Sequence, residues 1–244
     1  MTNNVLIFTP TYNEIGSIER WINEVISQGF PNILIVDDNS IDGTTELLTL
    51  KSQEVRQIEL RIRGSKSGIG SAHLLALEVA FEKGFDYLIT LDADLSHNPR
   101  DIPRFIEAVK SANYVVGTRS RGGRTELAGV RLILSRGANL VCRVMLPTGL
   151  SEYTTAYRCY DRKAMEFLIK NPPKDEGYSF FIEATDLIYR SGLKIAEIPI
   201  IFLDRMQGES KIPSFQVFRS AIKIVRLSLG RIRWRLLGGR KLQL

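Results

Sequence analysis

The chain has 244 residues, 44% of them hydrophobic and 25% charged, which is typical of a folded globular protein and excludes extensive disorder. This length can bury one substantial core and fits one domain or two small ones. The net charge of +6 is uneven, because residues 219–244 contain eight lysines or arginines and no acid. A basic end indicates either an anionic partner, such as phospholipid, nucleic acid or a phosphorylated substrate, or a solvated helix face.

The few cysteines and histidines exclude two common kinds of site. Cys142 and Cys159 lack disulfide-framework spacing and lie in periodic segments, so we expect buried, reduced thiols. His73 and His97 are the two histidines, and without a Cys/His cluster we expect no zinc site. There is no signal-peptide pattern and no run of ~20 apolar residues. We therefore expect a cytoplasmic protein that lies peripherally at a membrane surface.

The first half of the chain alternates short apolar strands with helices. Strands are predicted at residues 5–8, 33–36, 58–62, 87–91 and 114–116. Helices are predicted from about residue 18, from 42–45, from about 70 and over 103–110. This alternation predicts right-handed βαβ units and an α/β fold with a largely parallel sheet.

The pattern changes after residue 117. A glycine- and arginine-rich loop is expected over 119–128, and Pro199 places the last predicted strand at a sheet edge or bend. The remaining predicted elements are helices over about 130–145 and 180–189, strands near 156–160 and 195–202, and a loop over 204–213. We expect a catalytic domain over 1–213 and, over 214–244, an amphipathic helix with a basic tail that binds a membrane surface or packs on the domain.

The strand at 87–91 ends in Asp92-Ala93-Asp94, two carboxylates one residue apart. Such carboxylates can hold a divalent cation while leaving coordination positions for phosphate and water. At the carboxyl edge of an α/β sheet, this arrangement clamps the diphosphate of a nucleotide. Because a short acidic stretch is also common in solvated turns, the assignment depends on the neighbouring motifs.

Two phosphate-binding motifs are excluded. Gly68-Ile69-Gly70 resembles the start of a dinucleotide fingerprint, but His73 stands where the third glycine belongs, and the turn is not the first of the fold. The chain also lacks the Gly-Lys-Ser/Thr of a P-loop.

Several other stretches accompany the two aspartates. They are Thr-Pro-Thr-Tyr-Asn-Glu at 9–14, Val-Asp-Asp-Asn-Ser-Ile-Asp-Gly-Thr at 36–44, Gly-Ile-Gly-Ser-Ala at 68–72 and Asp-Arg-Met-Gln-Gly-Glu-Ser-Lys at 204–211. Taken together, the chain resembles the inverting family 2 glycosyltransferases, which have the Rossmann-like GT-A fold, over about residues 5–225. Ser-Arg-Gly-Ala-Asn at 135–139, together with 205–211, resembles the polyprenol-phosphate sugar transferases, a group that includes the dolichol-phosphate mannose synthases.

The resemblance implies three groups of site residues and a divalent cofactor, Mg²⁺ or Mn²⁺. The nucleoside site consists of Pro10, Tyr12, Glu14 and Asp38. The metal ligands are Asp92 and Asp94, and Asp92 also meets the nucleotide sugar. The phosphate-binding residues are Arg119, Arg131, Ser135, Arg205 and Lys211. Arg119 also counts, with the two aspartates, among the catalytic residues.

Some of these positions have a competing structural role. For Asp42 we expect helix capping, whereas Asp38 could cap the same helix or contact the base. Ser96 stands where some relatives have a metal-binding glutamine, which leaves that place to water. We expect a structural role for His97.

One departure from the family concerns the acceptor. The usual Asp-x-Thr-Gly-x-aromatic-Arg stretch reads Glu-Tyr-Thr-Thr-Ala-Tyr-Arg over 152–158. In relatives that act on hydroxyls, an acid in this region deprotonates the acceptor. A lipid monophosphate, with a second pKa of about 6, is already a nucleophile at neutral pH. The change therefore favours a phosphate acceptor.

The implied activity is inverting transfer of mannose from GDP-mannose to a polyprenyl or dolichyl phosphate. Another donor such as UDP-glucose, a glycan hydroxyl as acceptor, and a non-catalytic, membrane-associated accessory subunit remain open. The expected partners are the nucleotide sugar, the lipid phosphate, the cytoplasmic face of a membrane and a membrane-anchoring subunit. Nucleic acid is not expected, because the basic tail lacks an aromatic-basic reading motif.

Overall fold

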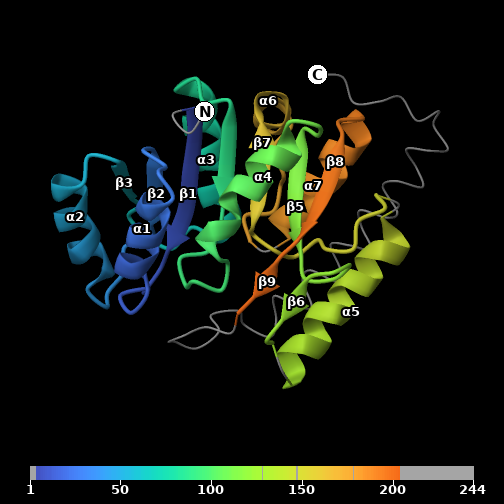
Figure 1. The fold of residues 1–244 in the computed structure, drawn as a ribbon, viewed down its shortest axis with the longest axis horizontal. Coiled ribbons are helices and arrows are strands. Elements are labelled where there is room, and N and C mark those ends of the chain that lie inside the picture. Colours follow the sequence, from blue (N-terminus) through green and yellow to red (C-terminus); the bar gives the residue numbers. More distant parts are fainter. Residues whose placement is uncertain (1–3, 128, 147, 178, 204–244) are drawn as a thin grey trace.

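The computed structural model describes residues 4–127, 129–146, 148–177 and 179–203, which form an α/β fold around one large sheet (Figure 1). In the order β3-β2-β1-β4-β7-β5-β8, its strands are β1 (Val5–Thr11), β2 (Ile33–Asp37), β3 (Ile58–Ile62), β4 (Tyr87–Thr90), β5 (Tyr114–Thr118), β7 (Arg158–Asp161) and β8 (Ile195–Pro199). The helices are α1 (Ile18–Ser27), α2 (Thr44–Glu54), α3 (Ile69–Glu82), α4 (Ile102–Val109), α5 (Gly129–Met145), α6 (Arg162–Lys170) and α7 (Phe180–Ser191). Two short strands, β6 (Arg124–Thr125) and β9 (Ile201–Phe202), pair separately.

The sheet is parallel except for one strand. β1 pairs in parallel with β2 and β4, and β5 pairs in parallel with β8. β7 lies between β4 and β5 and runs antiparallel to both. Because of this reversal, the chain that enters β7 comes from the edge at which β4 and β5 end. The loop before β7 therefore lies beside the loops after β4 and β5.

Helices cover both faces of the sheet. Successive strand residues point to opposite faces, so Phe8 and Val36 join one buried cluster while Ile7 and Ile35 join the other. The first cluster includes side chains of α3, α6 and α7, and the second includes those of α1 and α4. The helices themselves can be followed beside the sheet in Figure 1. Burial on both faces explains why the strands read as nearly continuous apolar runs.

Most of the predicted elements are confirmed. Pro199 ends β8 at the sheet edge, as expected, but the predicted strand at 195–202 is split between β8 and β9. The loop predicted at 119–128 contains β6. We did not predict α6, although Asp161 caps it by accepting a hydrogen bond from the backbone N–H of Ala164 at 2.8 Å. That capping residue was readable in the sequence.

Both cysteines are buried free thiols, which confirms the expectation for them. Burial, and secondarily the charge of Glu152, raises the pKa of Cys142 to about 12. No helix in the described part of the chain is long and apolar enough to cross a bilayer. The helix and basic tail predicted from residue 214 lie outside the described residues, so the division at 213/214 stays a prediction.

His73, on α3, is a buried histidine surrounded by aromatic rings. Its ring centroid lies 5.0, 5.8 and 4.8 Å from those of Phe8, Phe180 and Phe181. Neither ring nitrogen has a hydrogen-bond partner among the residues that the structure describes. Burial, and to a smaller degree the nearby positive charge of Arg158, lowers the pKa of His73 from its usual 6.5 to about 3. The folded protein therefore holds this ring neutral.

We expect His73 to make the folded state sensitive to acid. Below pH 6.5 the unfolded chain protonates this ring but the folded chain does not, so acid favours unfolding, with a contribution of about 1.4 kcal/mol per pH unit. Urea unfolding of the wild type and His73→Leu at pH 7, 6 and 5 measures it. In His73→Leu, the free energy of unfolding should fall less steeply as the pH is lowered. Leu77→Ala, a core change on the same helix, should keep the pH dependence of the wild type. Equal slopes in wild type and His73→Leu would contradict the assignment.

Candidate active site

The predicted site lies at the edge of the sheet where the parallel strands end. Asp37 is buried and is the last residue of β2. It joins the end of β1 to the loop that follows β2. Its carboxylate accepts hydrogen bonds from the hydroxyls of Thr11, Ser40 and Thr45 at 2.7, 2.7 and 2.6 Å. With its hydrogen bonds made inside the protein, Asp37 fixes the loops that carry the predicted nucleoside-binding residues.

Pro10, Tyr12 and Glu14 lie together where β1 leaves the sheet. The backbone N–H of Glu14 donates to the Thr44 hydroxyl at 2.9 Å, which holds this turn against the start of α2. The ammonium of Lys66 lies 4.2 Å from the centre of the Tyr12 ring. The turn thus places an aromatic ring and a carboxylate at the sheet edge, as the sequence predicted.

The two acidic residues after β2 have different roles. Asp42 precedes Gly43, the N-cap residue of α2, and accepts hydrogen bonds from the Thr44 backbone N–H and hydroxyl at 3.1 and 2.6 Å, so its role at the start of α2 is structural. Burial opposes its ionisation, but these hydrogen bonds and one from Ile15 lower the pKa of Asp42. Asp38 does not cap the helix but forms an ion pair with Arg63, which also donates to the Ser71 hydroxyl at 2.6 Å.

Asp92 and Asp94 follow β4 as predicted. Asp94 is 4% exposed, and one of its carboxylate oxygens accepts from the Ser96 backbone N–H and hydroxyl at 3.0 and 2.6 Å. The Asp92 side chain is 28% exposed. Two hard-oxygen carboxylates fit a divalent cation whose other ligands are diphosphate and water. In the described ranges, no three or more His, Cys, Asp or Glu residues come close enough together to hold a metal ion by themselves. The Ser96 hydroxyl orients the Asp94 carboxylate by its hydrogen bond.

His97 connects the aspartate loop to the loop before β7. Its Nδ1 accepts a hydrogen bond from the Asp92 backbone N–H at 3.1 Å, and its Nε2 lies 3.1 Å from the Thr155 hydroxyl. The ring is 1% exposed and packs against the rings of Tyr157 and Phe202. This geometry fits the structural role expected for His97.

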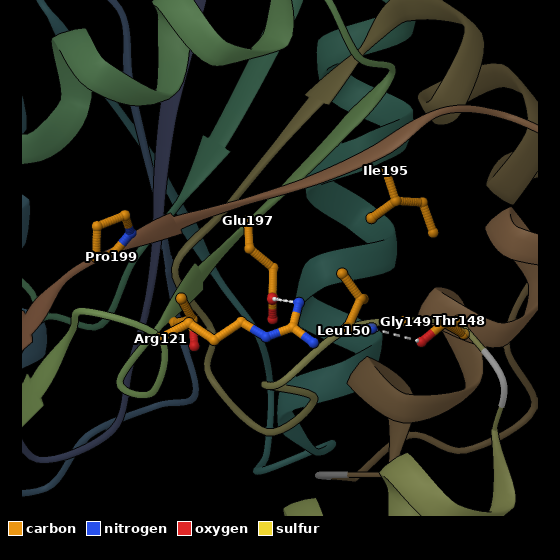
Figure 2. A pocket seen from close by; sticks show the side chains of 8 residues that line it. Arg121, Thr148, Gly149, Leu150, Ile195, Glu197 and Pro199 are labelled. Carbon is orange, nitrogen blue, oxygen red and sulfur yellow. Dashed lines mark hydrogen bonds and ion pairs between the residues drawn. The ribbon is translucent and has the colours of Figure 1, made fainter.

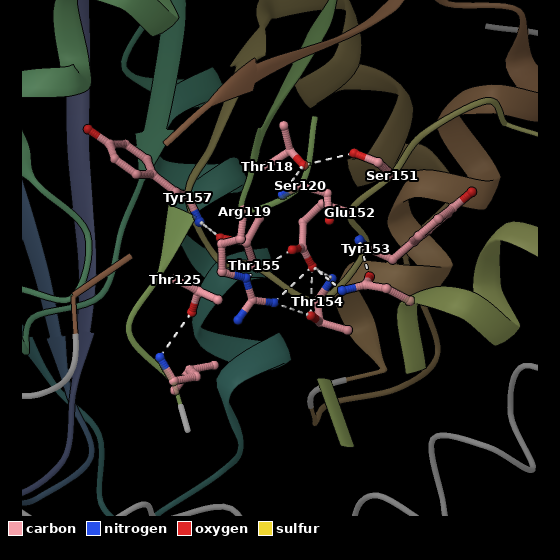
Figure 3. A network of polar contacts seen from close by, with 12 residues as sticks. Thr118, Arg119, Ser120, Thr125, Ser151, Glu152, Tyr153, Thr154, Thr155 and Tyr157 are labelled. Atoms are coloured by element: carbon pink, nitrogen blue, oxygen red, sulfur yellow. Dashed lines mark hydrogen bonds and ion pairs between the residues drawn. The ribbon is translucent and has the colours of Figure 1, made fainter. Parts of the chain in front are cut away.

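Arg119, directly after β5, forms a bidentate ion pair with Glu152 (Figure 3). Its Nε and one terminal nitrogen each lie 2.9 Å from a Glu152 oxygen, and that nitrogen also donates to the Thr154 hydroxyl at 2.7 Å. Asn139 of α5 donates to the same carboxylate at 2.8 Å. Burial alone would raise the pKa of Glu152, but the charge of Arg119 and hydrogen bonds from Arg119 and from the Thr154 hydroxyl and backbone N–H lower it to about 2. A carboxylate with so low a pKa is a poor general base at neutral pH.

A hollow of about 190 Å³ lies between this ion pair and α5. Its polar lining consists of Arg119, Ser120, Thr125, Ser135, Arg136, Asn139, Arg143 and Glu152. Three guanidinium groups face one carboxylate here, so the hollow is positively charged and rich in donors. Arginine and hydroxyl donors of this kind suit a phosphate group.

The predicted phosphate-binding residues are brought together in part. Arg119 and Ser135 both line the hollow, as expected. Arg131 belongs to α5, but the structure does not describe its side chain, and Arg205 and Lys211 lie outside the described residues. Sequence reasoning missed Arg136 and Arg143. Their spacing from Asn139, three residues before it and four after it on a predicted helix, was a usable signal, because residues three and four apart share a helix face.

Comparison with known proteins agrees with this geometry. The family model described as glycosyl transferase family 2 matches residues 6–168. Undecaprenyl-phosphate mannosyltransferase of Micrococcus luteus is 33% identical over 234 residues, which cover 94% of this chain and 96% of that protein. Polyprenol monophosphomannose synthase of Mycolicibacterium smegmatis is 32% identical over 229 residues, 91% of this chain and 86% of that protein.

Solved structures agree on the fold. The mannosyltransferase PcManGT from Pyrobaculum calidifontis, in complex with GDP-Man and Mn²⁺, superposes with a TM-score of 0.60 at 15% identity. The match covers 94% of this chain but 64% of that one, so this chain spans less than two thirds of that enzyme. At this identity the likeness shows the GT-A fold alone. The sequence relatives and the family model together show that this chain belongs to glycosyl transferase family 2.

Proposed function

We propose that this protein transfers mannose from GDP-mannose to a polyprenyl phosphate, with inversion at the sugar. The observation that carries the proposal is the arginine-lined hollow beside Glu152, whose carboxylate is buried and ion-paired. An acceptor phosphate in this hollow would lie among cationic and hydroxyl donors. The relatives named undecaprenyl-phosphate mannosyltransferase and polyprenol monophosphomannose synthase support the choice of sugar and lipid.

The chemistry of the acceptor agrees with the state of Glu152. In the reaction, a phosphate oxygen forms a bond to the anomeric carbon while the bond from that carbon to GDP breaks. A phosphate monoester needs no base for this step, because its second pKa is about 6. A hydroxyl acceptor would need one, and Glu152, with a pKa of about 2 and four donor groups around it, is unsuited to that role.

The donor would occupy the other half of the site. Pro10, Tyr12, Glu14 and Asp38 would hold the nucleoside, with Asp38 kept in place by Arg63. Asp92 and Asp94 would hold Mg²⁺ or Mn²⁺, and a bound cation supplies positive charge that stabilises the leaving diphosphate. The arginines of the hollow would orient the acceptor toward the anomeric carbon.

The test is an acceptor and donor comparison with the purified full chain. Radiolabelled GDP-mannose and UDP-glucose are each offered with a short polyprenyl phosphate, with the corresponding polyprenol, and with a mannose oligosaccharide. We expect a labelled lipid from GDP-mannose and the polyprenyl phosphate alone. Equal transfer to the polyprenol or the oligosaccharide would overturn the phosphate acceptor. Binding of GDP-mannose without transfer to any acceptor would favour the accessory-subunit alternative.

The exposed face of α5 supports a position at a membrane surface. Ile133, Leu140, Val141 and Val144 are 70, 55, 40 and 76% exposed, and they lie on one face of the helix, away from the buried Cys142. The residues of α5 that line the hollow lie on the neighbouring face of the helix, so a lipid whose phosphate lies in the hollow could run its hydrocarbon chain past these side chains. The exposed Arg136 and Arg143 would attract anionic headgroups. We infer that α5 rests peripherally on the cytoplasmic leaflet.

We expect Val144→Glu to weaken binding to anionic vesicles by about tenfold, because it puts a charge in the apolar face. Flotation with phosphatidylglycerol-phosphatidylcholine vesicles measures this. Ile41→Glu is the matched control, since Ile41 is a similarly open aliphatic residue, 84% exposed, in the loop between β2 and α2. If both variants float like the wild type, α5 does not contact lipid, and the basic segment over 214–244 remains the predicted membrane contact.

A further inference from the structure

Glu197, on the edge strand β8, directs its carboxylate at the loop before β7 (Figure 2). One carboxylate oxygen accepts hydrogen bonds from the backbone N–H groups of Ser151 and Glu152 at 2.7 and 2.9 Å. The Ser151 hydroxyl donates to the same carboxylate at 3.0 Å. The Glu197 side chain is 9% exposed, and Arg121 completes its contacts at 3.4 Å. Glu197 thus satisfies two adjacent backbone donors in a loop without regular secondary structure.

These contacts extend to the segment that carries Arg119. The Thr118 and Ser151 hydroxyls are 2.8 Å apart, and because Ser151 donates to Glu197, Thr118 is the donor between them. The Thr118 hydroxyl in turn accepts from the Ser120 backbone N–H at 3.0 Å (Figure 3). Arg119 lies between these two residues, and Glu152 directly follows Ser151. Glu197 therefore joins the two segments whose side chains form the Arg119–Glu152 ion pair.

The loop is not closely packed on the side that faces Glu197. A hollow of about 310 Å³ lies beside Glu197, and its lining includes Thr148, Gly149 and Leu150 of the same loop. Without the carboxylate, the N–H groups of Ser151 and Glu152 would be buried without their acceptor, which is costly, and the hollow leaves room for the loop to move. Displacements of about 1 Å at a positioning group can lower a rate by about a hundredfold.

We propose that Glu197 is a positioning residue for the acceptor site: it fixes the loop that carries Glu152 and thereby aims Arg119 into the phosphate-binding hollow. This inference rests on the proposed function. Glu197 lies outside the arginine-lined hollow, and yet the inference gives it a selective effect on the acceptor. Among the described residues, its hydrogen bonds and ion pair are to Ser151, Glu152 and Arg121, and none of these belongs to the donor half of the site. A general structural role would affect the two substrates equally.

The test compares three substitutions in the full-length protein. Glu197→Ala should lower kcat/KM for polyprenyl phosphate by about tenfold to a hundredfold and change KM for GDP-mannose less than about twofold. Glu197→Gln should recover most of this loss, because its amide oxygen can still accept from both N–H groups. Glu59→Ala is the matched control, since Glu59 lies on the opposite edge strand and has ion pairs to Arg61 and Lys83. It should leave both substrates unaffected.

Amide hydrogen exchange gives a readout that does not depend on activity. In Glu197→Ala the amides of Ser151 and Glu152 should exchange faster, while that of Val115 in β5 stays protected. If Glu197→Ala does not fold, Glu197→Asp, whose carboxylate is withdrawn by one methylene, takes its place with the same expected pattern. Equal loss for donor and acceptor, or unchanged exchange, overturns the inference. An inactive wild type overturns the proposed function instead, and exchange then still decides whether Glu197 holds the loop.

Discussion

Asp94→Ala is expected to lower the rate of mannose transfer by about a hundredfold to a thousandfold while the protein stays folded. Asp94 and Asp92 are the carboxylates proposed to hold the divalent cation, whose charge would stabilise the leaving diphosphate. The fold should tolerate the change, because the side chain lies in a loop after β4 and accepts hydrogen bonds from Ser96, two residues away. Their loss costs about 1–3 kcal/mol.

Initial rates in EDTA and after readdition of Mg²⁺ or Mn²⁺ provide the measurement, with Mn²⁺ binding followed directly by electron paramagnetic resonance. The wild type should lose activity in EDTA and regain it with either ion, whereas Asp94→Ala should bind Mn²⁺ weakly and stay inactive. Glu107→Ala, which removes an exposed acid paired with Lys110 on α4, should behave like the wild type. Undiminished turnover in EDTA would disprove the metal assignment.

Arg158→Met is expected to lower the free energy of unfolding by about 3–5 kcal/mol. Arg158 begins β7, is 0% exposed, and lies 4.8 Å from the ring centre of Phe181. Its guanidinium donates to the carbonyl oxygens of Tyr153, Thr155 and Phe181 at 2.6, 2.7 and 3.1 Å. Burial lowers the pKa of Arg158 to about 10, so the group remains charged at pH 7. Methionine fills similar space but leaves the three carbonyls without this donor.

Urea unfolding at pH 7 measures the loss. The control is Arg162→Met, four residues further on, where an exposed arginine donates to the carbonyl of Phe81 at 3.2 Å and lies over its ring at 4.2 Å. We expect that change to cost less than about 1 kcal/mol. If the two variants were equally stable, the bonds from the buried guanidinium to Tyr153, Thr155 and Phe181 would not stabilise the fold as proposed.

The donor half of the site could be predicted because its residues follow strands directly. An apolar run that ends in Asp92 and Asp94, or in Asp38, shows where a side chain emerges from a parallel sheet. The structural role of Asp42 was readable for the same reason, since it depends on contacts with nearby residues. These features are local in the sequence, so periodicity and turn chemistry are enough to find them.

The acceptor half depends on contacts between distant parts of the chain. Arg119 and Glu152 are 33 residues apart, and Glu197 is 45 residues from Glu152. No periodicity connects such pairs, and the antiparallel insertion of β7 that brings their loops together has no sequence signature of its own. Arg136 and Arg143 were missed because a helical wheel shows which residues share a face but not which loop that face meets.

The reversed strand β7 has a consequence for how new specificities can arise in this protein. The sheet is divided at β7 into a block that would hold the nucleotide, from β3 to β4, and a block that would hold the acceptor, with β5 and β8. The family match ends at residue 168, just beyond β7, and leaves α7, β8 and β9 outside it. Insertions or exchanges in the second block could therefore change what receives the sugar without disturbing the register of the strands that would hold the donor. Because β5, α5 and the loop before β7 lie between β4 and β7 in the chain, the natural segment to exchange in chimaeras runs from the end of β4 to the start of β7.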